Sequence, residues 1–288
     1  MLYLRIGSKT IQCALAAALL SATMAVAQTA ISLSPTIAAP GSSTVITGSS
    51  FVGTSQVTFS GHPAVFQVDS ATKITAIVPL AATTGLVAVT TPSGVATSSQ
   101  SFEVIAETWN AVENFSTASN PNGAWSYGWA PSLGGTFSLL TTNQNCLESK
   151  TVCWQNGLQE PDLAFVAKDS TPYNVVYYTV ALPYNVLWLG PEANAVIARW
   201  TAPSAGNYTI IGSFQAIDTE LAPVDLGILR DGATFLFTDS FTFYGEAKSF
   251  TLSNISLTAG TTIDFELAYT TDAYYDNVGL IASINLLK

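Results

Sequence analysis

The chain has 288 residues, of which 48% are hydrophobic and 10% are charged, so it can bury more than one core and is not intrinsically disordered. Nine Lys and Arg residues stand against 19 Asp and Glu residues, which gives a formal net charge of −10. Proteins that bind nucleic acid neutralise phosphates with a basic surface, so this composition argues against a nucleic-acid partner.

Residues 1–27 predict a secretory signal peptide. A short basic start precedes the apolar run 11–24, and Ala25-Val26-Ala27 supplies the small residues of a cleavage site. We therefore expect cleavage after Ala27 and a secreted or extracellular protein. No later stretch reaches the length of a membrane-spanning helix, so the sequence predicts no transmembrane segment.

Cys146 and Cys153 remain after the predicted cleavage. An even pair that frames a short loop in an exported protein predicts a disulfide, which stabilises the fold by about 2.5 kcal/mol in the chain-entropy model. A redox or metal pair would need the C-x-x-C spacing or nearby histidines, and the sequence has neither.

Residues 28–105 predict a small β-sandwich, because short β-branched runs alternate with Gly, Pro and Ser turns. The sole histidine, His62, follows Gly61 in a hairpin-like turn, where we expect an exposed loop residue rather than a catalyst. A zinc site built on two histidines is excluded. The runs lie at residues 44–47, 56–59, 73–78 and 86–90.

The order of the turn residues in this segment resembles the IPT/TIG family of immunoglobulin-like domains. The resemblance implies a spacer or presenting module of bacterial extracellular proteins, which is rarely catalytic. It is carried by Pro40-Gly41, Thr47-Gly48-Ser49-Ser50-Phe51, Val57-Thr58-Phe59-Ser60-Gly61, Ile77-Val78-Pro79 and Phe102-Glu103-Val104.

Residues 106–288 predict a second all-β domain, a jelly roll or related β-sandwich. Aromatic residues become frequent near Ala106, and eight or so alternating runs follow without any long helical repeat. The runs lie at residues 175–180, 195–200, 208–214, 224–229, 234–237, 249–252, 262–269 and 279–284.

Two turns in the second domain have specific sequence signals. Asp231-Gly232 predicts a type I′ hairpin, and Ala202-Pro203-Ser204-Ala205-Gly206 predicts a corner at which one strand stops and the next begins. In the run 262–269 alternation places Ile263 and Phe265 on one face and Asp264 and Glu266 on the other, which we expect to be solvated.

The second domain resembles carbohydrate-binding-module-like jelly-roll domains of secreted bacterial proteins, and this resemblance implies recognition of extracellular carbohydrate. Members often carry a Leu-His-Pro-Gly-like turn where this chain has Leu189-Gly190-Pro191-Glu192, so any role of that histidine is absent. The resemblance is carried by Asn120-Pro121-Asn122-Gly123-Ala124-Trp125-Ser126-Tyr127-Gly128, Arg199-Trp200-Thr201-Ala202-Pro203, Ala259-Gly260-Thr261-Thr262-Ile263-Asp264-Phe265 and Asp276-Asn277-Val278-Gly279-Leu280.

Sugars stack their CH faces on exposed aromatic rings, so exposed Trp and Tyr residues are the candidates for ligand binding. Trp125, Tyr127 and Trp129 alternate and would share one side of an extended segment. The alternative is that such rings fill a sandwich core, which we expect for Trp200. Further candidates in loops are Trp154, Trp188, Tyr274 and Tyr275.

The same resemblance implies a structural calcium ion between an early and a late acid, for which Glu113 and Asp276 are the candidates. No Gly-x-Ser-x-Gly elbow or phosphate-cradling loop occurs, and the second domain has no histidine, so we expect no enzyme.

The sequence thus predicts a secreted, non-catalytic protein that binds a polysaccharide or cell-surface glycan through aromatic loops. Two alternatives remain. One is a structural or adhesive module that contacts protein and has its tryptophans buried. The other is a weak glycoside hydrolase that uses a pair of its acids.

Overall fold

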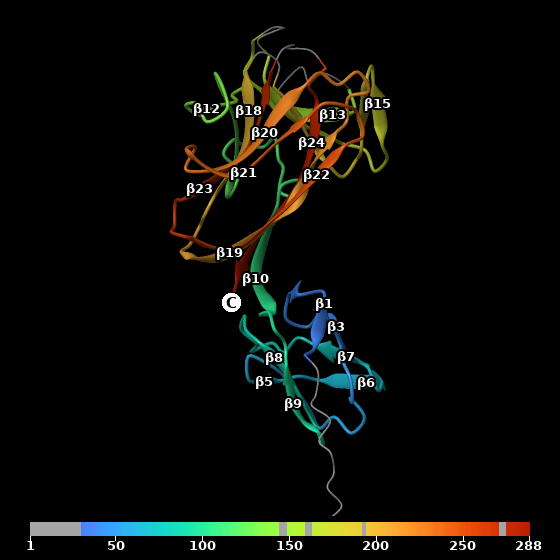
Figure 1. Cartoon of the computed structure of the whole chain (residues 1–288). Helices are drawn as coiled ribbons and strands as arrows, with labels where there is room; N and C mark the ends of the chain where they lie inside the picture. Colours follow the sequence, from blue (N-terminus) through green and yellow to red (C-terminus); the bar gives the residue numbers. More distant parts are fainter. Residues whose placement is uncertain (1–29, 144–148, 159–162, 192–193, 271–274) are drawn as a thin grey trace, which may run out of the picture.

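The computed structural model describes residues 30–143, 149–158, 163–191, 194–270 and 275–288. Every regular element in these ranges is a β-strand, which confirms the all-β prediction. The strands build two β-sandwiches, one below the other in Figure 1, joined by a strand that pairs with both. Within the same ranges no helix is long and apolar enough to cross a membrane. The predicted signal peptide, Cys146 and Tyr274 lie outside them.

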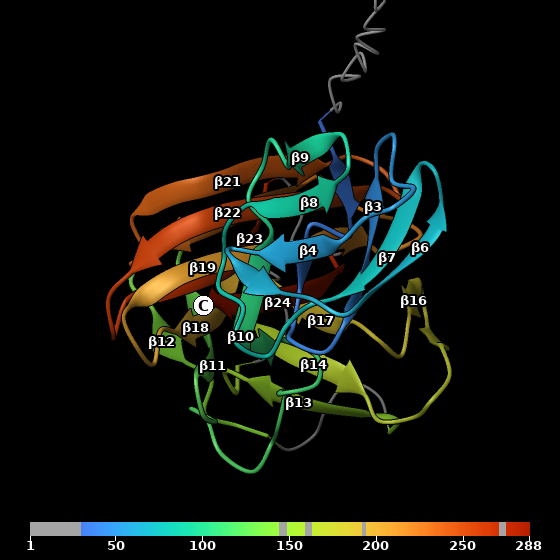
Figure 2. The same ribbon diagram turned by 90° about the horizontal axis from the view of Figure 1, so that it is seen from below.

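The N-terminal sandwich consists of two four-stranded antiparallel sheets. One has the order β1 (Ser32–Ser34), β3 (Ser43–Thr47), β7 (Lys73–Ile77) and β6 (Phe66–Ser70), and the other has β5 (His62–Pro63), β4 (Gln56–Phe59), β8 (Val87–Thr91) and β9 (Gly94–Thr97). The two layers are visible in Figure 2. Alternation along the strands turns Ile46, Val57 and Ile74 inward, where they form a core of their own.

Two turns of this sandwich, at Gly48 and just before His62, show why those residues occupy their positions. A Cβ atom on Gly48 would lie 2.7 Å from Phe51 Cζ, so the buried Phe51 ring packs where only a glycine leaves room. His62 follows a turn in which Ser60 and Gly61 have positive φ. It is half-buried in β5 and pairs with Phe59, so the expectation of an exposed loop histidine is wrong.

The C-terminal sandwich packs two larger sheets face to face. The first contains β13 (Thr151–Gln155), β14 (Phe165–Asp169), β17 (Leu187–Gly190), β24 (Val278–Leu287), β19 (Gly206–Ala216) and β22 (Ala247–Leu257), with β10 (Glu103–Asn110) next to β17 along one edge of β24. The second has the order β12 (Ser138–Leu139), β11 (Trp125–Ala130), β18 (Ala195–Thr201), β23 (Thr262–Tyr269), β20 (Val224–Arg230) and β21 (Thr234–Phe241).

The space between these sheets holds the main core. Trp200 is fully buried there and contacts Trp109 and Tyr208 at ring-centroid distances of 5.4 and 5.2 Å, which confirms its predicted core role. The corner after Thr201 carries the chain from the second sheet to the first, where β19 begins at Gly206. Tyr208 closes this corner by donating its hydroxyl hydrogen to the Ser204 carbonyl oxygen at 2.8 Å.

The predicted Asp231-Gly232 hairpin is present between β20 and β21, and both residues have positive φ as a type I′ turn requires. The predicted strand 175–180 is wrong. The chain turns back at Tyr178, which has a φ of 47°, and forms the hairpin of β15 (Val175–Tyr177) and β16 (Val180–Leu182). Periodicity alone did not mark the reversal, because apolar residues that include β-branched valines occupy both arms.

The junction between the sandwiches is made by β10. Its first residues pair with the parallel strand β2 (Ile37–Ala38), and from Ile105 onward it pairs with antiparallel β24. The predicted boundary near Ala106 falls at the irregularity in this strand. The Lys288 backbone N–H donates to the Val104 carbonyl at 2.8 Å, and the Thr84 N–H donates to the Lys288 carbonyl at 2.9 Å. The two sandwiches are therefore tied by continuous backbone hydrogen bonding.

Candidate functional site

Trp125, Tyr127 and Trp129 share one side of β11, as the alternation predicts, but that side faces the core. Trp125 and Tyr127 have 1% and 0% of their surface exposed, and Trp129 is half-buried against the same core. The expected stacking platform is corrected by this finding. The rings are buried because β12 and β18 flank β11 on both edges while the other sheet covers its inner face. Burial also raises the pKa of the Tyr127 phenol.

Trp154 and Trp188 are also buried rather than presented by loops, which corrects a second expectation. Their indole N–H groups donate to the Ser116 carbonyl at 2.8 Å and to Asn277 Oδ1 at 2.7 Å, respectively. Each tryptophan lies on a strand, so its ring belongs to the packing of the sandwich. Tyr275 is 43% exposed.

The calcium candidates differ in their surroundings. Asp276 is fully buried, whereas Glu113 is exposed. In the part of the chain that the structure describes, no group of three or more His, Cys, Asp or Glu side chains comes together. Calcium takes six to eight oxygen ligands, and these two acids supply only part of such a set. The calcium ion stays a prediction, as does the pairing of Cys146 with Cys153, which lies buried on β13.

The outer face of the second sheet carries a buried charge cluster. Arg199 on β18 donates to Asp264 on β23 through Nε–Oδ1 at 2.6 Å and Nη2–Oδ2 at 2.8 Å. Glu266 Oε2 accepts the backbone N–H of Gly134 at 2.7 Å. The Phe137 ring lies 3.9 Å from the Arg199 guanidinium carbon. Loop 131–137 therefore covers this face.

Asp264 and Glu266 have no exposed surface, so the expectation of a solvated acidic face is wrong. Burial raises the pKa of Glu266 to about 7. The Asp264 charge adds to the rise, and the Gly134 N–H and the Arg199 charge oppose it. Burial likewise raises the pKa of Asp264 against the opposing effect of Arg199. These carboxylates hold loop 131–137 on the sheet, which is a structural role.

The C-terminal sandwich has an open groove of about 570 Å³ beside the hairpin of β15 and β16, which we call the hairpin groove. Tyr184, half of whose surface is exposed, comes from the turn that follows this hairpin, and Phe115 comes from the loop after β10. The groove is lined by Phe115, Ser116, Thr117, Val152, Lys168, Asp169, Ser170, Thr171, Pro172 and Tyr184.

Charged side chains in the hairpin groove are held in fixed positions. Lys168 Nζ donates to the Val112 carbonyl at 2.8 Å. Asp169 Oδ1 accepts the backbone N–H and the hydroxyl of Thr171 at 2.7 and 2.8 Å. Its second oxygen, Oδ2, is buried and makes no hydrogen bond to the residues that the structure describes. The groove thus combines an exposed phenol ring with Ser and Thr hydroxyls and an ammonium group, which is a mixture expected of a saccharide site.

Among the residues that the structure describes, none of the predicted ligand-binding residues lines the hairpin groove. Its own residues come from four separated segments, so the sequence places them in no common motif. One available signal was Pro183-Tyr184-Asn185, because an aromatic residue in a Pro/Asn turn is exposed more often than one in an alternating strand.

No protein-family model matches the chain, and no curated protein matches it. Similar solved structures include SGBP-B from a complex xyloglucan utilization locus in Bacteroides uniformis, with 12% identity, a TM-score of 0.36, and coverage of 91% of this chain and 72% of that one. A family 35 carbohydrate binding module from Clostridium thermocellum matches with 10% identity and a TM-score of 0.23, over 46% of this chain and 90% of that one.

An enzyme is also among the similar structures. The enzymatically active domain of tailspike protein 4 from bacteriophage CBA120 matches with 9% identity and a TM-score of 0.24, over 57% of this chain and 20% of that one. At these identities and scores the similar structures assign the chain neither a family nor a ligand.

Proposed function

We propose that the protein is a secreted, non-catalytic binding protein that recognises extracellular carbohydrate through the hairpin groove. The observation that carries the proposal is the exposed Tyr184 ring beside the Ser and Thr hydroxyls of the groove. A phenol face suits the CH face of a pyranose, and the surrounding donors and acceptors suit its hydroxyls. The N-terminal sandwich, which resembles an IPT/TIG module, presents the binding domain.

A second candidate function is a structural or adhesive module that contacts protein. The observation that favours it is the burial of Trp125, Trp154, Trp188 and Trp200, which removes the indole rings from any binding surface. On this alternative the hairpin groove binds no sugar, and Tyr184 contributes only to a protein contact.

Affinity gel electrophoresis separates the two candidates. The full chain is run in gels that contain xyloglucan, xylan, galactan or glucomannan, and retardation reports binding. We expect at least one neutral polysaccharide to retard the wild type and Tyr184→Ala to lose most of the retardation.

The matched control is Tyr244→Ala, because Tyr244 is 47% exposed, close to the 49% of Tyr184, and does not line the groove. This variant should be retarded like the wild type. Absence of retardation of the wild type in all four gels would overturn the proposal in favour of the adhesive module. Equal retardation of Tyr184→Ala and wild type would exclude the hairpin groove as the binding site.

A further inference from the structure

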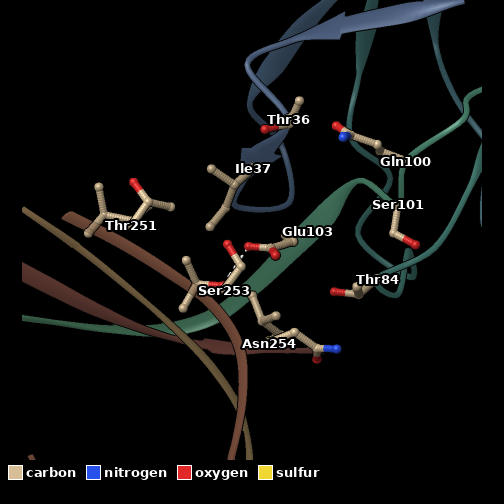
Figure 3. Close-up of a pocket in the computed structure, with 12 residues that line it drawn as sticks. Thr36, Ile37, Thr84, Gln100, Ser101, Glu103, Thr251, Ser253 and Asn254 are labelled. Atoms are coloured by element: carbon tan, nitrogen blue, oxygen red, sulfur yellow. Dashed lines mark hydrogen bonds between the residues drawn. The ribbon is translucent and has the colours of Figure 1, made fainter. Parts of the chain in front are cut away.

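The two sandwiches enclose a second cavity at their junction, of about 540 Å³, which we call the junction pocket (Figure 3). Thr36, Gln100 and Ser101 line it from the N-terminal sandwich, and Ser253 and Asn254 on β22 line it from the C-terminal one. Glu103 at the start of β10 lies between the two groups. A volume of this size falls within the range of small-ligand sites, roughly 300–1,000 Å³.

Two lining residues of the junction pocket, Glu103 and Thr84, are held in place by hydrogen bonds within the protein. Glu103 Oε2 accepts the hydroxyl hydrogen of Thr209 at 2.6 Å, and Thr209 is almost fully buried on β19. Thr84, which also lines the pocket, is tied through its backbone to Lys288 and through its hydroxyl to the Val104 N–H. A preformed pocket avoids the ordering cost that a hinged cleft pays on binding.

The polar groups that face the junction pocket are available to a ligand. Within the described part of the chain, the side chains of Gln100, Ser101, Ser253 and Asn254 make no hydrogen bond, and all four residues are exposed. Two amides and two hydroxyls supply donors and acceptors in one place. Among the described residues that line the pocket, Glu103 is the one ionisable residue and none has an aromatic ring. The chemistry therefore suits an uncharged ligand rich in hydroxyl groups.

A smaller cavity of about 210 Å³ adjoins the junction pocket along the N-terminal sandwich. The two cavities share Thr36 and Gln100, and the smaller one adds Ser32 and Ser99. Two adjoining cavities suit several linked sugar units better than a single one.

We propose that the junction pocket is a second saccharide site, which takes a neutral oligosaccharide and is separate from the hairpin groove. Its carboxylate disfavours acidic sugars, because Glu103 would lie close to a uronate group in a partly desolvated site. The proposal does not depend on the hairpin groove, since the two sites share no residue. If both sites bind one polysaccharide, the second contact raises the overall avidity without any new interface.

The test is an NMR titration of the full chain that follows the side-chain amide signals of Gln100 and Asn254. The probes are the tetrasaccharides of β-1,4-linked glucose, xylose, galactose and mannose, with tetragalacturonic acid as the acidic comparison. We expect saturable shifts of both amide signals with at least one neutral probe and about tenfold weaker binding of the acidic one.

Ser253→Phe fills the junction pocket from an exposed strand position and should abolish the shifts of the Gln100 signal. Ser249→Phe is the matched control, because Ser249 is also exposed on β22 but does not line the pocket. Glu103→Gln keeps an acceptor for Thr209 and should bring the acidic probe to within a few-fold of the neutral one. Circular dichroism of each variant confirms that it is folded.

Three results would overturn the proposal. They are the absence of saturable shifts with every neutral probe, shifts that persist in folded Ser253→Phe, and equal binding of the acidic probe by the wild type. Tyr184→Ala distinguishes the two sites: it should leave the junction titration unchanged even if polysaccharide retardation is lost. A junction titration that disappears in this variant would contradict the separate second site.

Discussion

The C-terminal sandwich contains two sets of aromatic rings with opposite surroundings. Trp125 and Trp200 lie between its sheets with almost no exposed surface, whereas Tyr184 stands half-exposed at the hairpin groove. The first set lies on strands with neighbours on both edges, and the second follows a hairpin. Alternation in a sequence therefore reports which side of a strand a ring occupies. Exposure of that side depends on which layers cover it.

The buried set should give the largest effect on stability. Trp125→Ala removes a ring that packs against Phe265 at 6.1 Å, and we expect a loss of about 3–5 kcal/mol in the free energy of unfolding. Trp125→Phe should cost less, since it keeps much of the ring and removes a buried indole N–H that has no hydrogen-bond partner among the described residues. Urea denaturation measures both. A loss below 1 kcal/mol for Trp125→Ala would contradict the core assignment.

Breaking the buried ion pair should have an effect of similar size. Arg199→Ala leaves Asp264 buried without its cation, and we expect a loss of about 3 kcal/mol or more in the free energy of unfolding. The double variant Arg199→Met with Asp264→Leu should recover much of that loss, because it leaves no buried charge unpaired. A double-mutant cycle measures the coupling. If the double variant is as unstable as Arg199→Ala, the unpaired charge on Asp264 does not cause the loss of stability in Arg199→Ala.

The buried acid Glu266 predicts a smaller, pH-dependent effect. Its pKa rises from 4.5 to about 7 on folding, so between these values the folded state holds a proton that the unfolded state has released. The free energy of unfolding should therefore fall as the pH rises through this window, by at most about 1.4 kcal/mol per pH unit.

The variant Glu266→Gln should flatten this dependence, since the amide oxygen still accepts the Gly134 N–H and does not titrate. Denaturation midpoints of the wild type and of the variant, determined at several pH values between pH 4.5 and pH 8, measure the pH dependence of stability. An unchanged slope in this variant would assign the pH dependence to other groups.

The exposed set should give the smallest effect on stability. Tyr184→Ala and Tyr244→Ala each remove a half-exposed ring, and we expect both to change the free energy of unfolding by less than about 0.5 kcal/mol. Thermal denaturation checks this. A larger loss of unfolding free energy for Tyr184→Ala would mean that the Tyr184 ring supports the fold. The contrast between a buried packing residue, Trp125, and an exposed binding residue, Tyr184, would then fail.

Local sequence signals predicted local structure well. Asp231-Gly232 requires positive φ at both residues, and the corner at Pro203 interrupts pairing, so each identified a turn from its own residues. The face of Asp264 and Glu266 was misjudged because loop 131–137, far away in the sequence, folds over it.

The candidate site could not be predicted for the same reason. Phe115, Val152, Lys168 and Tyr184 meet only because β10, β13, β14 and the hairpin are brought together by the sheet order. Single-sequence patterns record neighbours along one strand, and they contain no register between strands that are distant in the chain.

The strand β10 also determines how the molecule responds to tension. A pull that separates the two sandwiches acts along the β10 backbone, while its hydrogen bonds to β24 run perpendicular to the strands. The five residue pairs from Ile105–Leu287 to Asn110–Ser283 are then loaded together in shear instead of opening one at a time. A protein held by one sandwich and loaded through the other would therefore resist the force with all five pairs at once.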